Sequence, residues 1–154
     1  MQFNIICVGK CKDKNIISMY DDYVKRLRPF AKVNLMELNH GRGSVDEVKK
    51  QECDAILNKV GKSSFIIALD ERGKSLGTAK LADLVKQKTL EGFSDFSLII
   101  GGAEGLHEDI RQKANLVLSL SALTYPHMLV RVILAEQLYR ITTYNNGHPY
   151  HREG

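Results

Sequence analysis

Short apolar runs alternate along the chain with longer stretches in which apolar residues recur every three or four positions. The short runs indicate strands buried on both faces, and the periodic stretches indicate amphipathic helices. The predicted strands are 2–8, 32–38, 64–69, 96–100 and 115–120. The predicted helices are 16–27, 45–60, 78–91, 107–113 and 126–145, the third of them capped by Thr78.

This alternation predicts an α/β fold, because parallel neighbouring strands are joined by helical crossovers. We expect a mostly parallel sheet of about five to six strands with helices on both faces. The chain has 154 residues, which suits one domain with its own core. No linker, repeat or low-complexity segment interrupts it, so residues 1–154 are expected to form a single domain.

The last predicted helix has almost no polar face in its first half. Apolar residues occupy most positions from Met128 to Tyr139. A helix that is apolar all round is buried on all sides, and a sheet covers only one of them. A second copy of the chain would cover the other side, so we expect a homodimer.

The most informative segment is a glycine loop followed closely by a second irregular loop. The strand ending at Ile100 runs into Gly101, Gly102 and Gly105, and the next strand runs into a turn ending at Pro126. Loops at the carboxyl ends of parallel strands are where open α/β sheets bind ligands. The G-G-x-x-G spacing matches neither the dinucleotide fingerprint nor the P-loop. A plain tight turn is the alternative interpretation.

Charge and cysteine content indicate which partners and which compartment of the cell suit this chain. The net charge of +4 mildly favours an anionic partner. Basic residues that follow predicted strands suit a nucleic-acid backbone; they are Lys10, Lys12, Lys14, Arg42, Arg72 and Lys74. The cysteines show neither a disulfide framework nor a zinc spacing. No apolar run could span a bilayer and the first residues do not form a signal peptide, so we expect a cytoplasmic protein without metal or membrane association.

Three motifs together carry a resemblance to a known family. They are GGAEGLHEDI at 101–110, LSLSALTYPHMLVRVILAEQLYR at 118–140 and NNGHPYHREG at 145–154. In combination they resemble the bacterial RlmH family, the SPOUT-class 23S rRNA pseudouridine N3-methyltransferases. The resemblance extends over essentially the whole chain except 39–61. It implies a C-terminal trefoil knot, a pocket for S-adenosyl-L-methionine in the knotted loops, and 23S rRNA of the assembled ribosome as the target.

The resemblance also assigns cofactor contacts residue by residue: Leu69, Gly101, Gly102, Leu120, Ser121, Ala122, Leu123, Thr124 and Tyr125. Gly101 and Gly102 are expected to leave room for ribose and methionine, and leucines of the second loop to wall the adenine. Asp70 and Glu104 are candidates to face the sulfonium or amino group, with loop solvation or helix capping as the alternative.

The tail carries the expected catalytic residues. The resemblance implies that it folds over a cofactor pocket in the dimer. His151 is then the proton acceptor or orienter, Arg152 an RNA or transition-state contact, and Tyr150 a stacking group for a base. His127 is a weaker candidate, with helix capping as its alternative role.

Several assignments stay open at the level of sequence. Arg131 and Arg140 are expected either to bind RNA or to form ion pairs at an interface. A SPOUT methyltransferase with another RNA target is one alternative function. A non-catalytic ribosome-binding dimer is another, and it would have no affinity for the cofactor.

Overall fold

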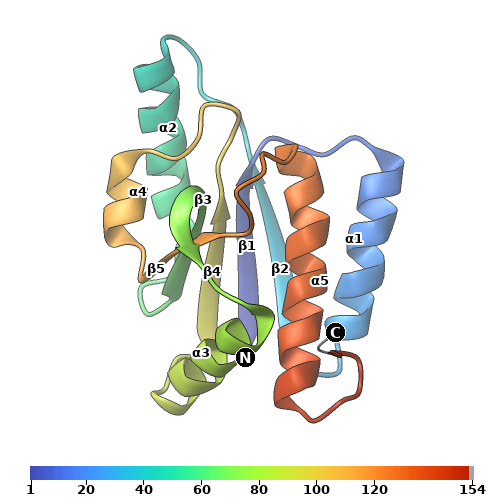
Figure 1. Cartoon of the computed structure of the whole chain (residues 1–154). Coiled ribbons are helices and arrows are strands. Elements are labelled where there is room, and N and C mark those ends of the chain that lie inside the picture. Colours follow the sequence, from blue (N-terminus) through green and yellow to red (C-terminus); the bar gives the residue numbers. More distant parts are fainter. Residues whose placement is uncertain (153–154) are drawn as a thin grey trace.

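The computed structural model describes residues 1–152 and contains a five-stranded, all-parallel sheet (Figure 1). The strand order is β2-β1-β4-β3-β5. This confirms the predicted α/β class. The strands are β1 (Gln2–Val8), β2 (Lys32–Leu38), β3 (Phe65–Ser75), β4 (Asp95–Ile100) and β5 (Leu116–Ser119). The helices are α1 (Lys14–Leu27), α2 (Val45–Leu57), α3 (Thr78–Leu90), α4 (Glu108–Lys113) and α5 (His127–Asn145).

Alternate side chains of the central strands enter two separate cores. Phe3 and Ile5 of β1 lie in the larger core, which also takes residues of α1, α3 and α5. Ile6 and Val8 of the same strand lie in the smaller core with residues of α2 and α4. Successive strand residues point to opposite faces of a sheet, so helices cover both faces, as expected (Figure 1).

β3 is longer than its sequence pattern indicates. The apolar run ends at Leu69, yet the strand continues through polar residues to Ser75. Leu69 and Lys74 both pair with Leu118 of β5, so the register of the two strands shifts between these two residues of β3. Gly73 permits this close approach, because a Cβ there would lie 2.5 Å from the carbonyl oxygen of Val117.

Two helix starts differ from the prediction. The N-cap of α3 is Gly77 and not Thr78, whose hydroxyl instead donates a hydrogen bond to Gln137 Oε1 of α5 at 3.0 Å. The N-cap of α5 is Pro126, so His127 begins that helix without capping it. At α3, the contact of Thr78 with α5 takes the hydroxyl that would otherwise be free to cap the helix.

α5 is buried around most of its circumference. Val132, Ala135 and Leu138 lie in the larger core. A stripe at helical spacing stays half-buried or exposed: Leu129, Ile133, Gln137, Arg140 and Tyr144. One side of the helix is therefore left uncovered by this chain. Within residues 1–152, no helix has the length and apolar character needed to cross a membrane.

Candidate functional site

A cavity of about 520 Å³ opens at the carboxyl ends of three neighbouring strands, β4, β3 and β5. Its walls are the part of β3 from Leu69 to Arg72, the glycine loop after Ile100 and the loop from Leu120 to the start of α5. The cavity therefore unites the two loops that the sequence singles out. Most of the expected cofactor residues line it: Leu69, Gly101, Gly102, Leu120, Ser121, Leu123, Thr124 and Tyr125. Ala122 is exposed and lies outside the lining.

The glycine loop is compact because its glycines let it pack on the protein itself. Gly105 has a φ of +78° and donates its backbone N–H to the carbonyl oxygen of Gly102 at 3.0 Å. A Cβ on Gly101 would lie 3.0 Å from the Leu106 side chain. A Cβ on Gly102 would lie 3.1 Å from Glu52 Oε2. A side chain at either position would thus crowd neighbouring protein atoms, and both glycines lie in the lining of the cavity. The room that they are expected to leave for ribose and methionine stays a prediction.

The second loop is held by hydrogen bonds of its own serines. Ser119 donates from its hydroxyl to the carbonyl oxygen of Ser121 at 3.0 Å. Ser121 Oγ accepts the backbone N–H of Leu123 at 3.0 Å. Leu123 itself is 69% exposed. This loop accordingly presents backbone groups and leucine side chains to the cavity, a combination that suits an aromatic base.

Asp70 is not a free carboxylate at the cavity wall. Its side chain is 6% exposed and accepts hydrogen bonds from the backbone N–H of Arg72 at 2.9 Å and from Arg111 Nη1 at 3.1 Å. Burial alone would raise the pKa of Asp70, but these bonds outweigh it and hold the pKa below its ordinary value. Glu104, in contrast, is exposed at the rim, so of the two expected acidic groups it is the available one; Glu71 is a further exposed carboxylate of the lining.

His127 stands in the cavity wall as a neutral imidazole. Burial lowers its pKa, and the positive charge of Arg131 and the neighbouring His40 lower it further. Its Nε2 is buried and has no hydrogen-bond partner among the described residues. The rings of His40 and His127 meet edge to face with centroids 6.5 Å apart. Of the expected acid–base candidates, His127 is the one that lies at the cavity of its own chain.

The tail candidates lie elsewhere, on the carboxyl half of α5. The ring of Tyr150 packs on Tyr139 with centroids 4.6 Å apart, and its hydroxyl donates to Glu136 Oε1 at 3.2 Å. His151 lies beside Arg140, with 3.4 Å between Nδ1 and Nη1. His127 and Arg140 are separated by about 20 Å along a helix rising 1.5 Å per residue. Figure 1 shows the C-terminus beside the lower end of α5, opposite the carboxyl edge of the sheet.

Arg131 and Arg140 of α5 form ion pairs within the chain. The sequence leaves open whether these two arginines bind RNA or form ion pairs at an interface. Arg131 is 2% exposed and donates to Glu37 Oε2 at 2.6 Å and to the carbonyl oxygen of Gly9 at 2.5 Å. Arg140 donates to Glu136 Oε1 through both Nε and Nη2. Arg131 therefore anchors the start of α5 to the end of β1. Arg140 shapes the surface on which the tail rests.

Three ligand-type side chains gather outside the cavity, where α2 meets α4: Cys53, His107 and Asp109. His107 Nδ1 already accepts the backbone N–H of Asp109 at 3.1 Å, as the cap of α4. The ammonium of Lys50 lies 3.6 Å from Asp109 Oδ2, and burial raises the pKa of the Cys53 thiol. These contacts explain the cluster without a metal ion.

A cavity framed by loops at the carboxyl edge of a parallel sheet is typical of α/β proteins that bind a small molecule. The family described as "Predicted SPOUT methyltransferase" matches residues 1–151. The chain therefore belongs to the SPOUT methyltransferase family, which confirms the resemblance in the sequence. The knot that the resemblance implies stays a prediction.

Relatives match along the whole chain. A protein of Clostridium novyi (strain NT) named Ribosomal RNA large subunit methyltransferase H is 42% identical, over 99% of this chain and 100% of that protein. One of the same name from Streptococcus uberis is 36% identical, with the same coverage. Among solved structures, the tRNA (m1G37) methyltransferase of Aquifex aeolicus aligns with a TM-score of 0.56 and 17% identity, over 100% of this chain and 76% of that one. That likeness shows the fold alone.

Proposed function

We propose that this protein is an S-adenosyl-L-methionine-dependent methyltransferase that methylates N3 of a pseudouridine in 23S rRNA of the assembled ribosome. The observation that carries the proposal is the cavity that unites Leu69, the glycine loop and the loop 120–125. Its volume of about 520 Å³ lies within the range of small-molecule sites. The names of the full-length relatives support a ribosomal RNA target.

The residues of the cavity fit the proposed cofactor. Leu120 and Leu123 supply apolar walls for a base, and the backbone groups of the second loop are placed to recognise its edge. Glu104 offers negative charge at the rim for the amino group. When bound, the cofactor supplies an electrophilic methyl group, so no metal is needed for the transfer.

The remaining chemistry is the removal of one proton. N3 of the target base is an imide nitrogen that carries a proton near neutral pH, and its lone pair must attack the methyl carbon. The protein must therefore accept the N3 proton and hold the ring in line with the breaking carbon–sulfur bond. We assign proton acceptance or orientation to His151, transition-state or RNA contact to Arg152, and base stacking to Tyr150.

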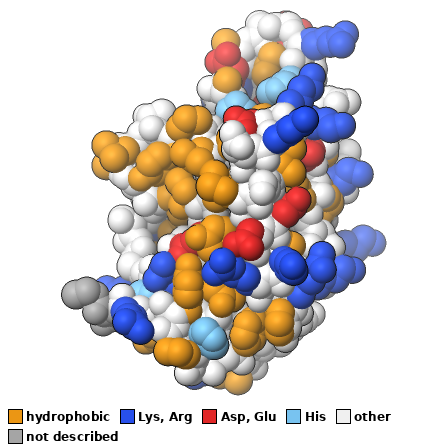
Figure 2. Space-filling view, turned by 90° about the vertical axis from the view of Figure 1, so that its right-hand side faces the viewer, with side chains coloured by type: hydrophobic (Ala, Val, Ile, Leu, Met, Phe, Trp, Pro, Cys, Tyr) orange, Lys and Arg blue, Asp and Glu red, His pale blue; other side chains and the backbone are white. Residues whose placement is uncertain are grey.

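This assignment requires a homodimer, because the tail of one chain lies far from its own cavity. We propose that the uncovered stripe of α5, with the exposed Leu123, meets a second copy, so that the tail of each chain completes the cavity of the other. Figure 2, which faces the side of α1 and α5, shows hydrophobic side chains gathered in a patch on this side, with lysine and arginine side chains around them. We place the protein in the cytoplasm, where ribosomes are modified.

Transfer of a labelled methyl group from S-adenosyl-L-methionine to purified assembled ribosomes tests the proposal, with free 23S rRNA as the comparison. We expect labelling of the assembled ribosome alone, and mass spectrometry of the digested RNA should find the methyl group on a pseudouridine. Labelling of tRNA or of another nucleotide would replace the proposed target. Ribosome binding without any cofactor affinity would indicate a non-catalytic dimer.

A further inference from the structure

The guanidinium of Arg111 joins two walls of the cavity. Its Nη1 donates to the carbonyl oxygen of Leu106, where the glycine loop ends, at 2.8 Å. The same Nη1 donates to Asp70 Oδ2, directly after Leu69 of β3, at 3.1 Å. Glu108 accepts from Nε at 2.9 Å and also from Nη2. Arg111 thus spans from α4 to both walls.

The burial of these groups makes the link strong. The Arg111 side chain is 14% exposed and that of Asp70 is 6% exposed. Asp70 also accepts from the Nε of Arg72 at 3.3 Å, so its charge is balanced from two sides. Charge-assisted hydrogen bonds shielded from water are stronger than exposed ion pairs. In contrast, Glu108 is 58% exposed, and its bond to Arg111 is a surface contact within one helix.

The third wall of the cavity is organised differently. The loop 120–125 is held by the hydrogen bonds of Ser119 and Ser121, which stay within that segment. The ladder of β3 and β4, in which Leu69 lies opposite Ile100, aligns the two strands themselves. Among the hydrogen bonds described for residues 1–152, those of Arg111 are the ones by which a single side chain connects Leu106 of the glycine loop to Asp70 of β3, beyond that aligned pair.

We propose that Arg111 is a positioning residue that sets the width of the cofactor cavity by tying Leu106 to Asp70. The inference rests on the proposed function, because it takes S-adenosyl-L-methionine as the ligand. Arg111 does not touch the ligand in this proposal. It acts through the Leu106 carbonyl and the Asp70 carboxylate, and so fixes the far end of the glycine loop against β3 beyond the paired residues Leu69 and Ile100.

Three variants and a control isolate this role. Arg111→Ala removes both bonds. Arg111→Lys keeps the charge but loses the planar fork that reaches several acceptors at once, and Asp70→Asn removes the charge of the partner. Glu108→Gln is the matched control, because it weakens the exposed pair and leaves both wall contacts in place.

Calorimetric titration with S-adenosyl-L-methionine, together with the melting temperature of the ligand-free protein, gives the readout. We expect Arg111→Ala and Asp70→Asn to raise the Kd roughly 10- to 100-fold, the scale of removing one charged hydrogen bond. Arg111→Lys should fall between these and the wild type, and Glu108→Gln should match the wild type. In steady-state assays the KM for the cofactor should rise while kcat at saturation stays near that of the wild type.

A lowered melting temperature with an unchanged Kd in the folded variants would overturn the proposal and leave Arg111 a purely structural role. If Arg111→Ala does not fold, the Kd of Arg111→Lys and Asp70→Asn decides the question alone. Failure of the wild-type protein to bind the cofactor would instead refute the proposed function, so the two failures are distinguishable.

Discussion

The hydroxyl of Tyr150 donates a hydrogen bond to Glu136 across 3.2 Å, which folds the tail back onto the helix that precedes it. Arg140 reinforces this arrangement, since its guanidinium lies 4.8 Å from the centroid of the Tyr150 ring. Burial raises the pKa of Tyr150 to about 12, so its hydroxyl stays protonated and remains a donor. Tyr150 and His151 therefore pack at the far end of α5 from the cavity.

Mixed dimers should show whether the tail acts on the cavity of the partner. Thr124→Trp fills the cavity of one chain, and His151→Ala removes the acid–base group of the other. Each variant alone should be nearly inactive. Co-expressed with two different tags and purified as a mixture, they should recover about a quarter of the wild-type rate, because half of randomly formed dimers are mixed and each has one intact site.

The control for this experiment is cofactor binding by His151→Ala, which should equal that of the wild type. A mixture that stays inactive, although both variants dimerise, would show that the tail does not serve the partner's cavity. Full activity of His151→Ala alone would remove His151 as proton acceptor and direct attention to His127, the neutral histidine in the cavity wall.

Dimer formation should depend on the uncovered stripe of α5. Ile133 lies on this stripe, beside a smaller hollow of about 230 Å³ that also includes Tyr125 and Gln137. Ile133→Glu should shift the protein toward a folded monomer in light scattering, since a charge there is stranded in an apolar contact. Ile17→Glu on α1, which is 39% exposed, is the matched control and should leave the dimer unchanged.

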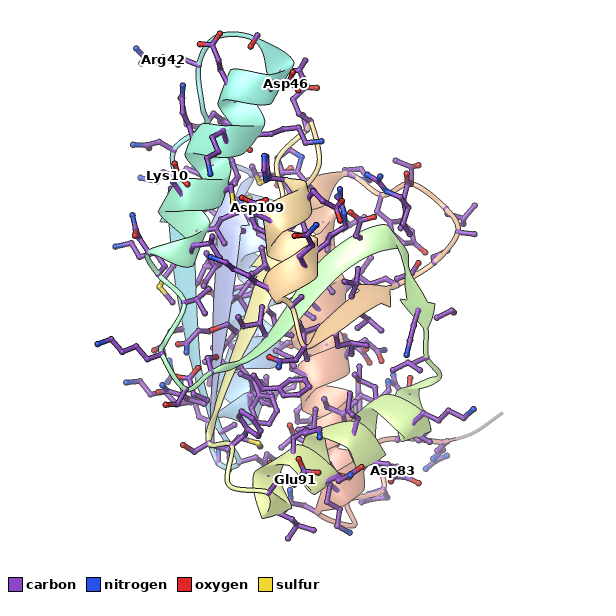
Figure 3. The ribbon with its side chains drawn as sticks, turned by 90° about the vertical axis from the view of Figure 1, so that its left-hand side faces the viewer. Lys10, Arg42, Asp46, Asp83, Glu91 and Asp109 are labelled. Atoms are coloured by element: carbon purple, nitrogen blue, oxygen red, sulfur yellow. The ribbon has the colours of Figure 1, made fainter. Side chains whose placement is uncertain are left out.

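Affinity for ribosomal RNA should depend on the basic residues at the carboxyl edge of the sheet. Lys10, Lys12 and Arg42 are exposed. In Figure 3, Lys10 and Arg42 lie at the α2 end of the molecule, whereas Asp83 and Glu91 mark the opposite end, at α3. Charge reversal of these three basic residues should weaken binding and flatten its salt dependence. The log–log slope should fall by about 0.7 to 0.9 for each phosphate that the protein no longer neutralises.

Lys80→Glu and Lys86→Glu supply the comparison for this prediction. Both lysines are exposed on α3, so the double variant reverses two positive charges at the other end of the molecule. An equal loss of affinity per reversed charge in the two sets would mean that net charge alone, and not the position of the basic residues, governs binding.

Stability at high pH should report the burial of Cys7. Its thiol is 0% exposed, and burial raises its pKa to about 11, partly offset by Arg131. Because the pKa of this thiol in the folded state lies above the ordinary 9.0, the protonated thiol stabilises the folded state. This contribution is fully present below about pH 9. That contribution disappears as the pH rises toward 11. The unfolding free energy of the wild type, measured by urea denaturation, should fall between pH 8.5 and pH 10.5. In Cys7→Ala this fall should be smaller by about 2 kcal/mol. An identical drop in both proteins would contradict the assignment.

The order of strands and helices followed from the sequence because it depends on local periodicity. The short apolar run at 2–8 indicates a strand buried on both faces, and the periodic stretch at 16–27 indicates an amphipathic helix, so each pattern identifies its element. The glycine loop and the loop 120–125 could likewise be placed together. The ends of parallel strands meet at one edge of the sheet, whatever the order of the strands.

The tertiary structure alone decided which charged groups are free and which are already paired. Asp70 and Arg111 lie far apart in the sequence, and only folding brings them together as a buried pair. Arg131 has the residue type of an RNA contact, yet it lies 2% exposed against Glu37. Long-range pairing and burial determine the chemistry of such groups. Neither can be inferred from the local spacing of residues. For the same reason, the sequence could offer the tail as a candidate for catalysis but could not place Tyr150 and His151 at the opposite end of α5 from the cavity.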